Sequence, residues 1–346
     1  MQRRDLGRAM RCSRRATSAS EGNATAPPVQ AEPLQPARVH RFYRGGALLG
    51  RLRDEPEEDS FFPEDWIGSV TQARNPGRTD LEEGLSRLAD GRVLRDAVQT
   101  DPIAWLGAEH VASFGTSTGL LVKLLDAGER LPVHAHPDRA FAREALDSLF
   151  GKTEAWIVLD TRRDEADVWV GLRERLEPER YLAWIADQEV DRLLHSLNRI
   201  SVRAGDVVYV PAGVPHAIGA GVLLVELQEP TDFSIVCEWD GFPISPDDAH
   251  MGLGWETAIK ALDLRAHEPV RRLPESARSF FFADAVAAPA ERFAILLAVA
   301  GAGVLDGSAV RAGDGFAIPA ACDAFDVAGD VRVLRCLAPD PRREAV

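Results

Sequence analysis

The chain has 346 residues, which is enough for two modest domains or for one domain with an additional layer. Its hydrophobic fraction of 45% and charged fraction of 27% are typical of a soluble globular protein, and no apolar run reaches the roughly 18 residues of a membrane helix. The formal net charge of -14 disfavours nucleic acid and anionic membranes as partners, so we expect neither.

The first 38 residues differ from the rest of the chain. They hold six arginines among the first 15 residues and then a run rich in Ser, Ala and Pro, without apolar periodicity. A transit peptide would need an amphipathic stretch and few acids, whereas this segment lacks the former and contains Asp5. We therefore expect a disordered tail over residues 1–38.

The four cysteines are spaced without any C-x-x-C pair, at Cys12, Cys237, Cys322 and Cys336. A chain of this size needs no disulfide framework for stability. We expect free thiols and a cytoplasmic location.

Hydrophobic periodicity and turn residues predict the elements that follow the tail. In chain order we expect folded sequence from about residue 38, a helical region over 80–115, a buried strand at 120–125, a strand carrying two histidines, a helix over 137–150, a strand at 155–159 and a helix over 178–198. Beyond residue 202 short strands and turns dominate, apart from a helix at 255–263. This pattern predicts a mainly β fold of the jelly-roll type, with the helices as an insert and a flank.

One internal repeat is visible. The segment from Gly205 to His216 starts with Gly-Asp, continues as a strand and reaches Pro-Ala, and the segment from Gly313 to Ala324 repeats this order. We infer two jelly-roll units, a catalytic one over residues 39–264 and a degenerate one over 265–346, in which Ala324 stands where the first unit has His216.

The segment Gly205–His216 also has the spacing of a metal-site motif, in which a tight turn leads into a strand and a later turn fixes His216 inside the barrel. His134 and His136 are two residues apart, so both imidazoles lie on the same side of a strand. Glu154 precedes another strand and offers a carboxylate. We predict that these four residues bind one divalent metal ion, for which Zn, Fe, Mn and Ni are all suitable.

Glu226 lies within the apolar strand from Val222 to Gln228. A charge there is costly unless it is paired or used, and a raised pKa would suit a general base. The alternative is a buried glutamate that hydrogen bonds hold for structural reasons.

These motifs together resemble type I mannose-6-phosphate isomerases of the cupin superfamily. The matching stretches, in the family's order and with its gaps, are Leu121–Ala127, His136-Pro137-Asp138, Gly151–Trp156, Pro211-Ala212-Gly213 and His216–Gly219, with a weaker match at Glu64, Trp66 and Ser69. The resemblance implies a cupin double jelly roll with a helical insert and flanking helices. It also implies zinc as the cofactor and interconversion of mannose 6-phosphate and fructose 6-phosphate.

Residue by residue, the resemblance implies that His136, Glu154 and His216 are zinc ligands. It places Lys123 and Lys152 in the substrate pocket and makes Glu226 a catalytic residue, so we expect catalytic roles for all three.

The sequence departs from the family at two positions. His134 stands where the family usually has Gln, which leaves the metal identity open, and Val236 stands where the family has a catalytic Arg. We expect Arg44 or Arg139 to supply that charge, unless the substrate differs.

Two other functions fit the same ligands. A cupin dioxygenase would use Fe or Mn, although the two lysines argue against it. A non-catalytic sugar-binding protein would explain the missing Arg. The sequence leaves open the metal, the exact sugar, the effect of Val236 and the oligomeric state.

Overall fold

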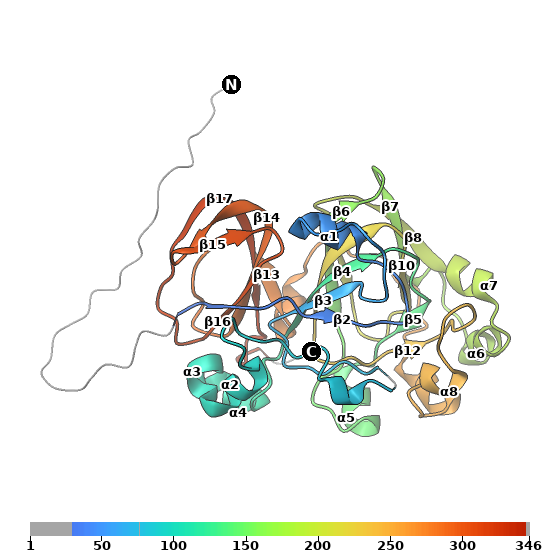
Figure 1. The fold of residues 1–346 in the computed structure, drawn as a ribbon. Coiled ribbons are helices and arrows are strands. Elements are labelled where there is room, and N and C mark those ends of the chain that lie inside the picture. The colour runs from blue at the N-terminus through green and yellow to red at the C-terminus, as the bar shows by residue number, and fades with distance from the viewer. Residues whose placement is uncertain (1–29, 76, 344–346) are drawn as a thin grey trace, which may run out of the picture.

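The computed structural model describes residues 30–75 and 77–343. Two β units lie side by side, with short helices around their periphery (Figure 1). Among the described residues, no helix is both long and apolar enough to cross a membrane. The expected mainly β architecture is confirmed. The Arg-rich run and Cys12 lie outside the described residues, while the three other cysteines are free and buried.

Two antiparallel sheets form the first unit. One has the strand order β2-β3-β4-β11-β6-β9, and the other has the order β12-β5-β10-β7-β8. The strands of the first sheet are β2 (Arg38–Val39), β3 (Glu64–Ile67), β4 (Leu121–Ala127), β6 (Glu154–Thr161), β9 (Val207–Val210) and β11 (Val222–Gln228). Those of the second are β5 (His134–Ala135), β7 (Ala166–Leu172), β8 (Leu197–Val202), β10 (His216–Ile218) and β12 (Ile235–Val236).

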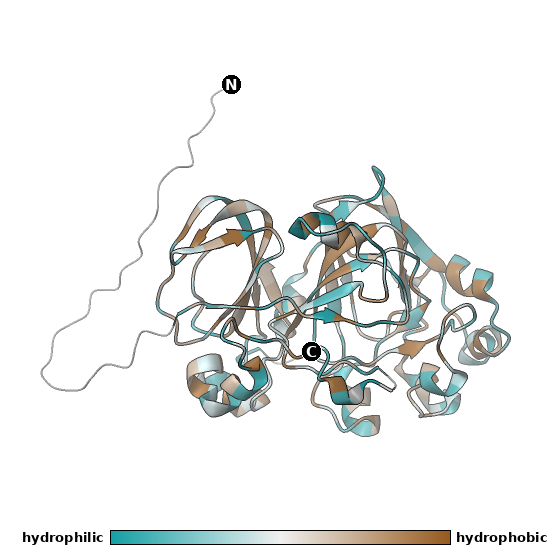
Figure 2. Ribbon diagram, in the orientation of Figure 1, coloured by the Kyte–Doolittle hydropathy of each residue, from teal (hydrophilic) through white to brown (hydrophobic). Residues whose placement is uncertain are grey.

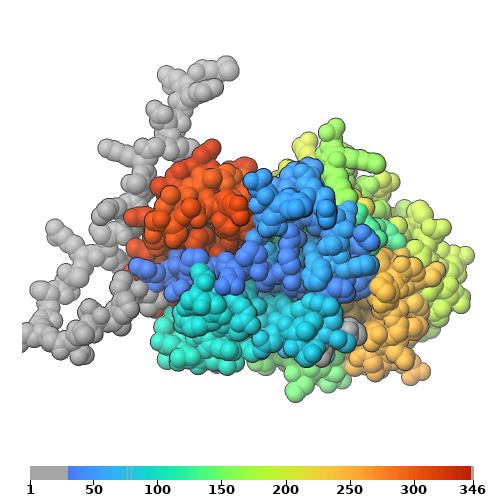
Figure 3. Space-filling model, in the orientation of Figure 1, coloured from blue at the N-terminus to red at the C-terminus, as the bar shows by residue number. Residues whose placement is uncertain are grey.

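A third sheet forms the second unit, in the order β1-β16-β14-β17-β13, with β15 on β14. Its strands are β1 (Glu32–Pro33), β13 (Phe282–Asp284), β14 (Ala294–Leu305), β15 (Ser308–Arg311), β16 (Gly315–Ile318) and β17 (Val327–Leu337). Residues 30–38, the last part of the expected tail, therefore belong in part to a sheet. Figure 3 shows the N-terminal described residues running across the face between the two units.

The helices are short. They are α1 (Ala47–Arg53), α2 (Leu94–Thr100), α3 (Pro102–Leu106), α4 (Ala108–Phe114), α5 (Arg139–Ala145), α6 (Pro178–Ala186), α7 (Val190–His195), α8 (Pro246–Ala249) and α9 (Trp255–Ala258), with 3-10 turns η1 (Thr79–Leu81), η2 (Ile259–Ala261) and η3 (Glu275–Ser279).

The helical region expected over residues 80–115 is wrong in its first half. Residues 82–93 are turns and bridges, and Leu81 is exposed rather than on a buried face. Gly84 and Gly91 adopt positive φ there, and farther along Pro102 and Gly107 divide the remainder into three helices. The helix was predicted from the spacing of Leu81, Leu85, Leu88 and Leu94, and the last three are buried without forming a continuous helix.

The apolar residues lie mainly on the strands of both units, as the brown segments in Figure 2 show. One cluster of buried residues spans both units, since it joins Leu223 and Val225 of β11 with Ile295 of β14. Strand β11 is buried along its whole length and pairs with β4 and β6 on either side, which explains its nearly continuous apolar sequence.

The internal repeat is also a repeat of hydrogen bonds. Gly205 and Gly313 both have φ of 93°, and in each copy the residue after the glycine closes the same turn. Asp206 accepts a hydrogen bond from the Arg203 N–H at 3.0 Å, and Asp314 accepts one from the Arg311 N–H at 2.9 Å. Each turn also makes a pair of backbone bonds to one residue of a neighbouring strand, at Val158 in the first copy and Ala298 in the second. The likeness ends before Ala324, which is exposed and lies in a loop.

Candidate metal centre and adjoining pocket

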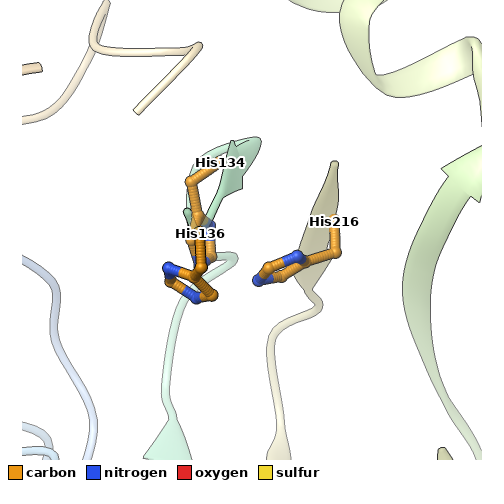
Figure 4. A group of neighbouring side chains, drawn as sticks. All are labelled: His134, His136 and His216. Atoms are coloured by element: carbon orange, nitrogen blue, oxygen red, sulfur yellow. The ribbon is translucent and has the colours of Figure 1, made fainter. Parts of the chain in front are cut away.

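Three histidines from the first unit converge at one point. His134 lies in β5, His136 directly follows that strand, and His216 begins β10. The two strands are antiparallel neighbours, and His134 is the register partner of His216. One ring nitrogen of each imidazole lies within 4.8 Å of those of the other two, and all three side chains are buried (Figure 4).

A backbone carbonyl fixes the tautomer of each imidazole. His134 Nδ1 lies 2.8 Å from the Pro132 carbonyl oxygen, and His216 Nδ1 lies 2.8 Å from that of Val214. His136 Nδ1 lies 2.7 Å from the carbonyl oxygen of Phe233. A carbonyl only accepts, so each Nδ1 carries the proton and each Nε2 presents a lone pair. This is the arrangement that metal-binding histidines adopt.

Glu154 begins β6 and faces two of these lone pairs. Its Oε2 lies 3.2 Å from His136 Nε2, and its Oε1 lies 3.3 Å from His216 Nε2. The Trp156 indole N–H donates to Oε1 at 3.0 Å and so orients the carboxylate.

Several of these atoms are acceptors without a donor. His136 Nε2, His216 Nε2 and Glu154 Oε2 are buried and have no hydrogen-bond partner among the described residues. Buried acceptors that face each other are unfavourable unless a cation lies among them. Three imidazoles and a carboxylate are common ligands of divalent metals, so this donor set fits such an ion.

The pKa values favour the same protonation states. Burial, followed by the Lys152 ammonium, lowers the pKa of His136 to about 3. Burial also lowers the pKa of His134 and of His216. Burial alone would raise the pKa of Glu154, but its interactions with His136, the Lys152 ammonium and His216 lower it well below its usual range. Near neutral pH the site therefore holds neutral imidazoles and an ionised carboxylate.

The three predicted catalytic residues border one small pocket with His134. Lys123 in β4 and Glu226 in β11 are register partners, and their Nζ and Oε2 atoms are 3.0 Å apart. Lys152 Nζ lies 3.6 Å from Glu154 Oε2. All three of these residues line the pocket together with His134.

Charged residues that the sequence analysis did not place extend this pocket. Glu64 lies 3.4 Å from Lys123 Nζ and accepts hydrogen bonds from the Tyr43 hydroxyl and the Trp66 indole N–H. Arg41 lies 3.3 Å from Glu64 and donates two hydrogen bonds to the Asp232 carboxylate, at 2.9 Å and 3.2 Å. The weak Glu64-Trp66 match was the one sequence signal for this network.

Val236 lies beside the metal centre. It pairs with His134 from strand β12, on the edge of β5 opposite the one that pairs with His216 in β10. It lines the pocket, whereas neither Arg44 nor Arg139 does. Arg44 lies over the Phe61 ring and donates to the Asp59 carbonyl. Arg139 donates to Glu229 at 2.5 Å and to the Ser279 carbonyl at 3.1 Å. The expectation that one of these two arginines supplies the missing charge is therefore wrong for this structure.

Two antiparallel β units, with converging neutral imidazoles and a carboxylate inside the first, define a cupin whose pocket suits a divalent metal ion.

No family model matches the chain. Curated relatives include the mannose-6-phosphate isomerase of Streptococcus mutans, 41% identical over 135 residues, which are 38% of this chain and 41% of that protein. ManA of Bacillus subtilis, also named a mannose-6-phosphate isomerase, is 37% identical over 131 residues, or 37% of this chain and 40% of that one. The chain thus matches about two fifths of the length of these relatives.

Solved structures extend the likeness over most of the fold. The mannose 6-phosphate isomerase from Bacillus subtilis has a TM-score of 0.68 at 22% identity and covers 89% of this chain and 99% of its own. A variant of the phosphomannose isomerase from Salmonella typhimurium has a TM-score of 0.63 at 16% identity, over 90% of this chain and 100% of its own. The resemblance inferred from the motifs and the cupin double jelly roll are both confirmed.

Proposed function

We propose that this chain is a metal-dependent aldose–ketose isomerase that interconverts mannose 6-phosphate and fructose 6-phosphate. The observation that carries the proposal is a buried carboxylate and two lysines in one pocket with a set of metal-competent imidazoles. The relatives named mannose-6-phosphate isomerase support the choice of substrate. The proposed partner is thus a small sugar phosphate.

In this proposal His134, His136, Glu154 and His216 hold one divalent ion, for which zinc is our choice. Their neutral lone pairs and the ionised carboxylate suit such an ion without rearrangement. A bound divalent ion would supply Lewis-acid polarisation of the sugar oxygens at the reacting end. The remaining chemistry belongs to the side chains that border the pocket.

Glu226 is the proposed general base, which moves the proton between C1 and C2 through an enediolate. Burial raises its pKa, although the Lys123 ammonium, whose Nζ lies 3.0 Å from Oε2, opposes this shift. A raised carboxylate pKa brings the group closer to the operating pH, where it can both accept and return a proton.

Lys123 and Lys152 act as fixed positive charges. Burial would lower the pKa of Lys123, but the carboxylates of Glu226 and Glu64 outweigh it and raise that pKa, so the ammonium stays charged. A charge held inside a water-poor pocket stabilises the negative charge that develops on the sugar oxygens. Lys152 contributes from the metal side of the same pocket.

The full-length protein tests this proposal directly. We expect stoichiometric metal by elemental analysis and conversion of mannose 6-phosphate that chelation abolishes and added zinc restores. Metal at full occupancy without any conversion would reject the isomerase and favour a sugar-binding protein. Oxygen consumption with iron or manganese bound would favour the dioxygenase. The cytoplasmic location stays a prediction.

A further inference from the structure

Two hollows adjoin each other in front of the metal centre. The inner pocket offers about 30 Å³ to a water-sized molecule, whereas the outer cavity offers about 880 Å³. They share lining from Arg41, Phe42, Ser234 and Val236. The inner space corresponds to roughly one or two water molecules, and the outer one falls in the size range of small-molecule sites. A hexose can therefore place only its reacting end inside, and the rest of the molecule must lie in the outer cavity.

The outer cavity differs from the inner pocket in how its cations are used. Arg41 is paired with Asp232 and Glu64, and Arg78 is paired with Glu83 at 2.6 Å. Within residues 30–75 and 77–343, no carboxylate forms an ion pair with the Arg74 guanidinium, although this side chain also lines the cavity. The chain has a formal net charge of -14, so most of its surface repels anions. A guanidinium without a carboxylate partner provides a local positive charge that can attract one.

Contacts to the segment that lines both hollows fix the position of Arg74. Its backbone N–H donates to Asp232 Oδ2 at 2.8 Å, and its guanidinium lies over the Phe233 ring, 5.0 Å from the centroid. The carbonyl of Phe233 in turn accepts the hydrogen bond from His136 Nδ1. The guanidinium is thus attached to the same backbone segment that orients a proposed metal ligand.

We infer that Arg74 binds the phosphate group of the substrate in the outer cavity, while the other end of the sugar enters the inner pocket. This inference rests on the proposed isomerase function and adds a specificity-determining residue to it. A guanidinium that stacks on an aromatic face keeps its N–H edge free, and that edge matches two phosphate oxygens. The inner cations are already engaged by carboxylates, which leaves them poorly suited to a second, distant anion.

The test compares Arg74→Gln with the wild type and with Arg44→Gln. Arg44 is a matched control, because it also stacks on a phenylalanine yet does not line the outer cavity. We expect Arg74→Gln to raise KM for mannose 6-phosphate by about 10- to 100-fold with kcat changed by less than about threefold. The KM of Arg74→Lys should lie between those of the wild type and Arg74→Gln, whereas the KM of Arg44→Gln should match that of the wild type.

A binding measurement separates this inference from the isomerase proposal. Mannitol 6-phosphate and mannitol have no carbonyl to isomerise and differ only in the phosphate. By calorimetry, Arg74→Gln should weaken the binding of mannitol 6-phosphate by a similar factor, and should leave mannitol unaffected.

The outcomes are distinguishable. Equal KM values and equal mannitol 6-phosphate affinities in the wild type and Arg74→Gln would overturn the role of Arg74, even if the enzyme isomerises well. A wild type that binds mannitol 6-phosphate through Arg74 but converts no mannose 6-phosphate would support the phosphate site and reject the isomerase.

Discussion

The metal-centre residues illustrate how far local spacing determines chemistry at the residue scale. His134 and His136 could be recognised because alternate residues of a strand share a face, and His216 because it follows a turn motif. The carbonyl acceptors of their Nδ1 protons could not be recognised in the same way. The carbonyl that holds His136 belongs to Phe233, 97 residues away, and only the folded chain brings the two together.

Substitution of the histidines gives the first prediction. His216→Ala should abolish stoichiometric metal, because it removes a lone pair that no other described residue replaces at that position. His134→Gln should retain metal, since the amide oxygen can still act as a ligand. Elemental analysis of both purified variants measures the effect. A full equivalent of metal in His216→Ala would contradict the ligand assignment.

Glu226→Gln gives the second prediction. The substitution conserves volume but removes the base, so we expect kcat to fall by about 10²- to 10⁴-fold. Metal content should be unchanged, because the carboxylate is not among the proposed ligands. Steady-state kinetics and metal analysis on the same preparation check both parts. Turnover near the wild-type value would assign the proton transfer to another group.

At the scale of elements, the sequence predicted buried strands better than helices. The strands expected at 120–125 and 155–159 correspond to β4 and β6. The long helix expected over 178–198 is divided into α6 and α7, and the chain has already entered β8 at Leu197. The helix breaks at Gln188, which adopts a positive φ. The side-chain amide of Gln188 donates hydrogen bonds to the carbonyls of Ile185 and Cys237 at this break. Periodicity cannot reveal such a break when apolar residues continue on both sides of it.

The strand β1 leads to the third prediction, which concerns where the N-terminal segment can be cut. Removal of residues 1–29 should leave thermal stability unchanged. Removal of residues 1–37 deletes β1, the hydrogen bond from Leu34 N–H to the Gly315 carbonyl, and the packing of Leu34 on the shared core. Burial of one leucine with its hydrogen bonds corresponds to about 3 kcal/mol, so in a chain of this size the melting temperature should fall by roughly 4–5 °C.

Scanning calorimetry on the two truncated proteins distinguishes these cases. Equal melting temperatures would show that β1 contributes little to thermal stability. The folded part of the chain would then begin nearer residue 38, as predicted from the sequence alone.

At the scale of the whole molecule, buried ion pairs connect segments that are distant in the sequence. Arg41 and Asp232 are 191 residues apart, and both are largely buried. Neither residue belongs to a spacing motif, so no sequence pattern indicated that they meet. Asp232 also accepts the backbone N–H of Arg74, and so three separate segments meet at one carboxylate.

This carboxylate gives the fourth prediction. Burial would raise the pKa of Asp232, but Arg41 and more distant lysines lower it to about 2. A lowered folded-state pKa means that the stabilisation is complete above the ordinary value of 3.8 and is lost as the pH falls toward 2. Asp232→Asn should reduce the free energy of unfolding by about 3 kcal/mol at pH 7. That difference from the wild type should shrink between about pH 4 and pH 2.

Asp263→Asn is the matched control for this experiment. The pKa of Asp263 is also lowered to about 2, first by its hydrogen bond with Arg265, but the Arg265 side chain is exposed to solvent. Solvent screens such pairs, so the control should cost less than about 1 kcal/mol. Urea unfolding at several pH values measures both variants, and an equal cost for the two would show that burial of the Arg41 pair adds nothing.

The duplicated Gly-Asp turn has a consequence for how such proteins are recognised in genomes. Both copies make the same turn and lead into a strand and a proline, yet only the first copy continues to a buried histidine. The glycine, aspartate and proline are thus requirements of barrel construction, whereas the histidine is a requirement of metal chemistry. A search pattern built on the first three residues alone will collect barrels that never bound an ion. Patterns that also demand the paired histidines and the glutamate will separate the two populations.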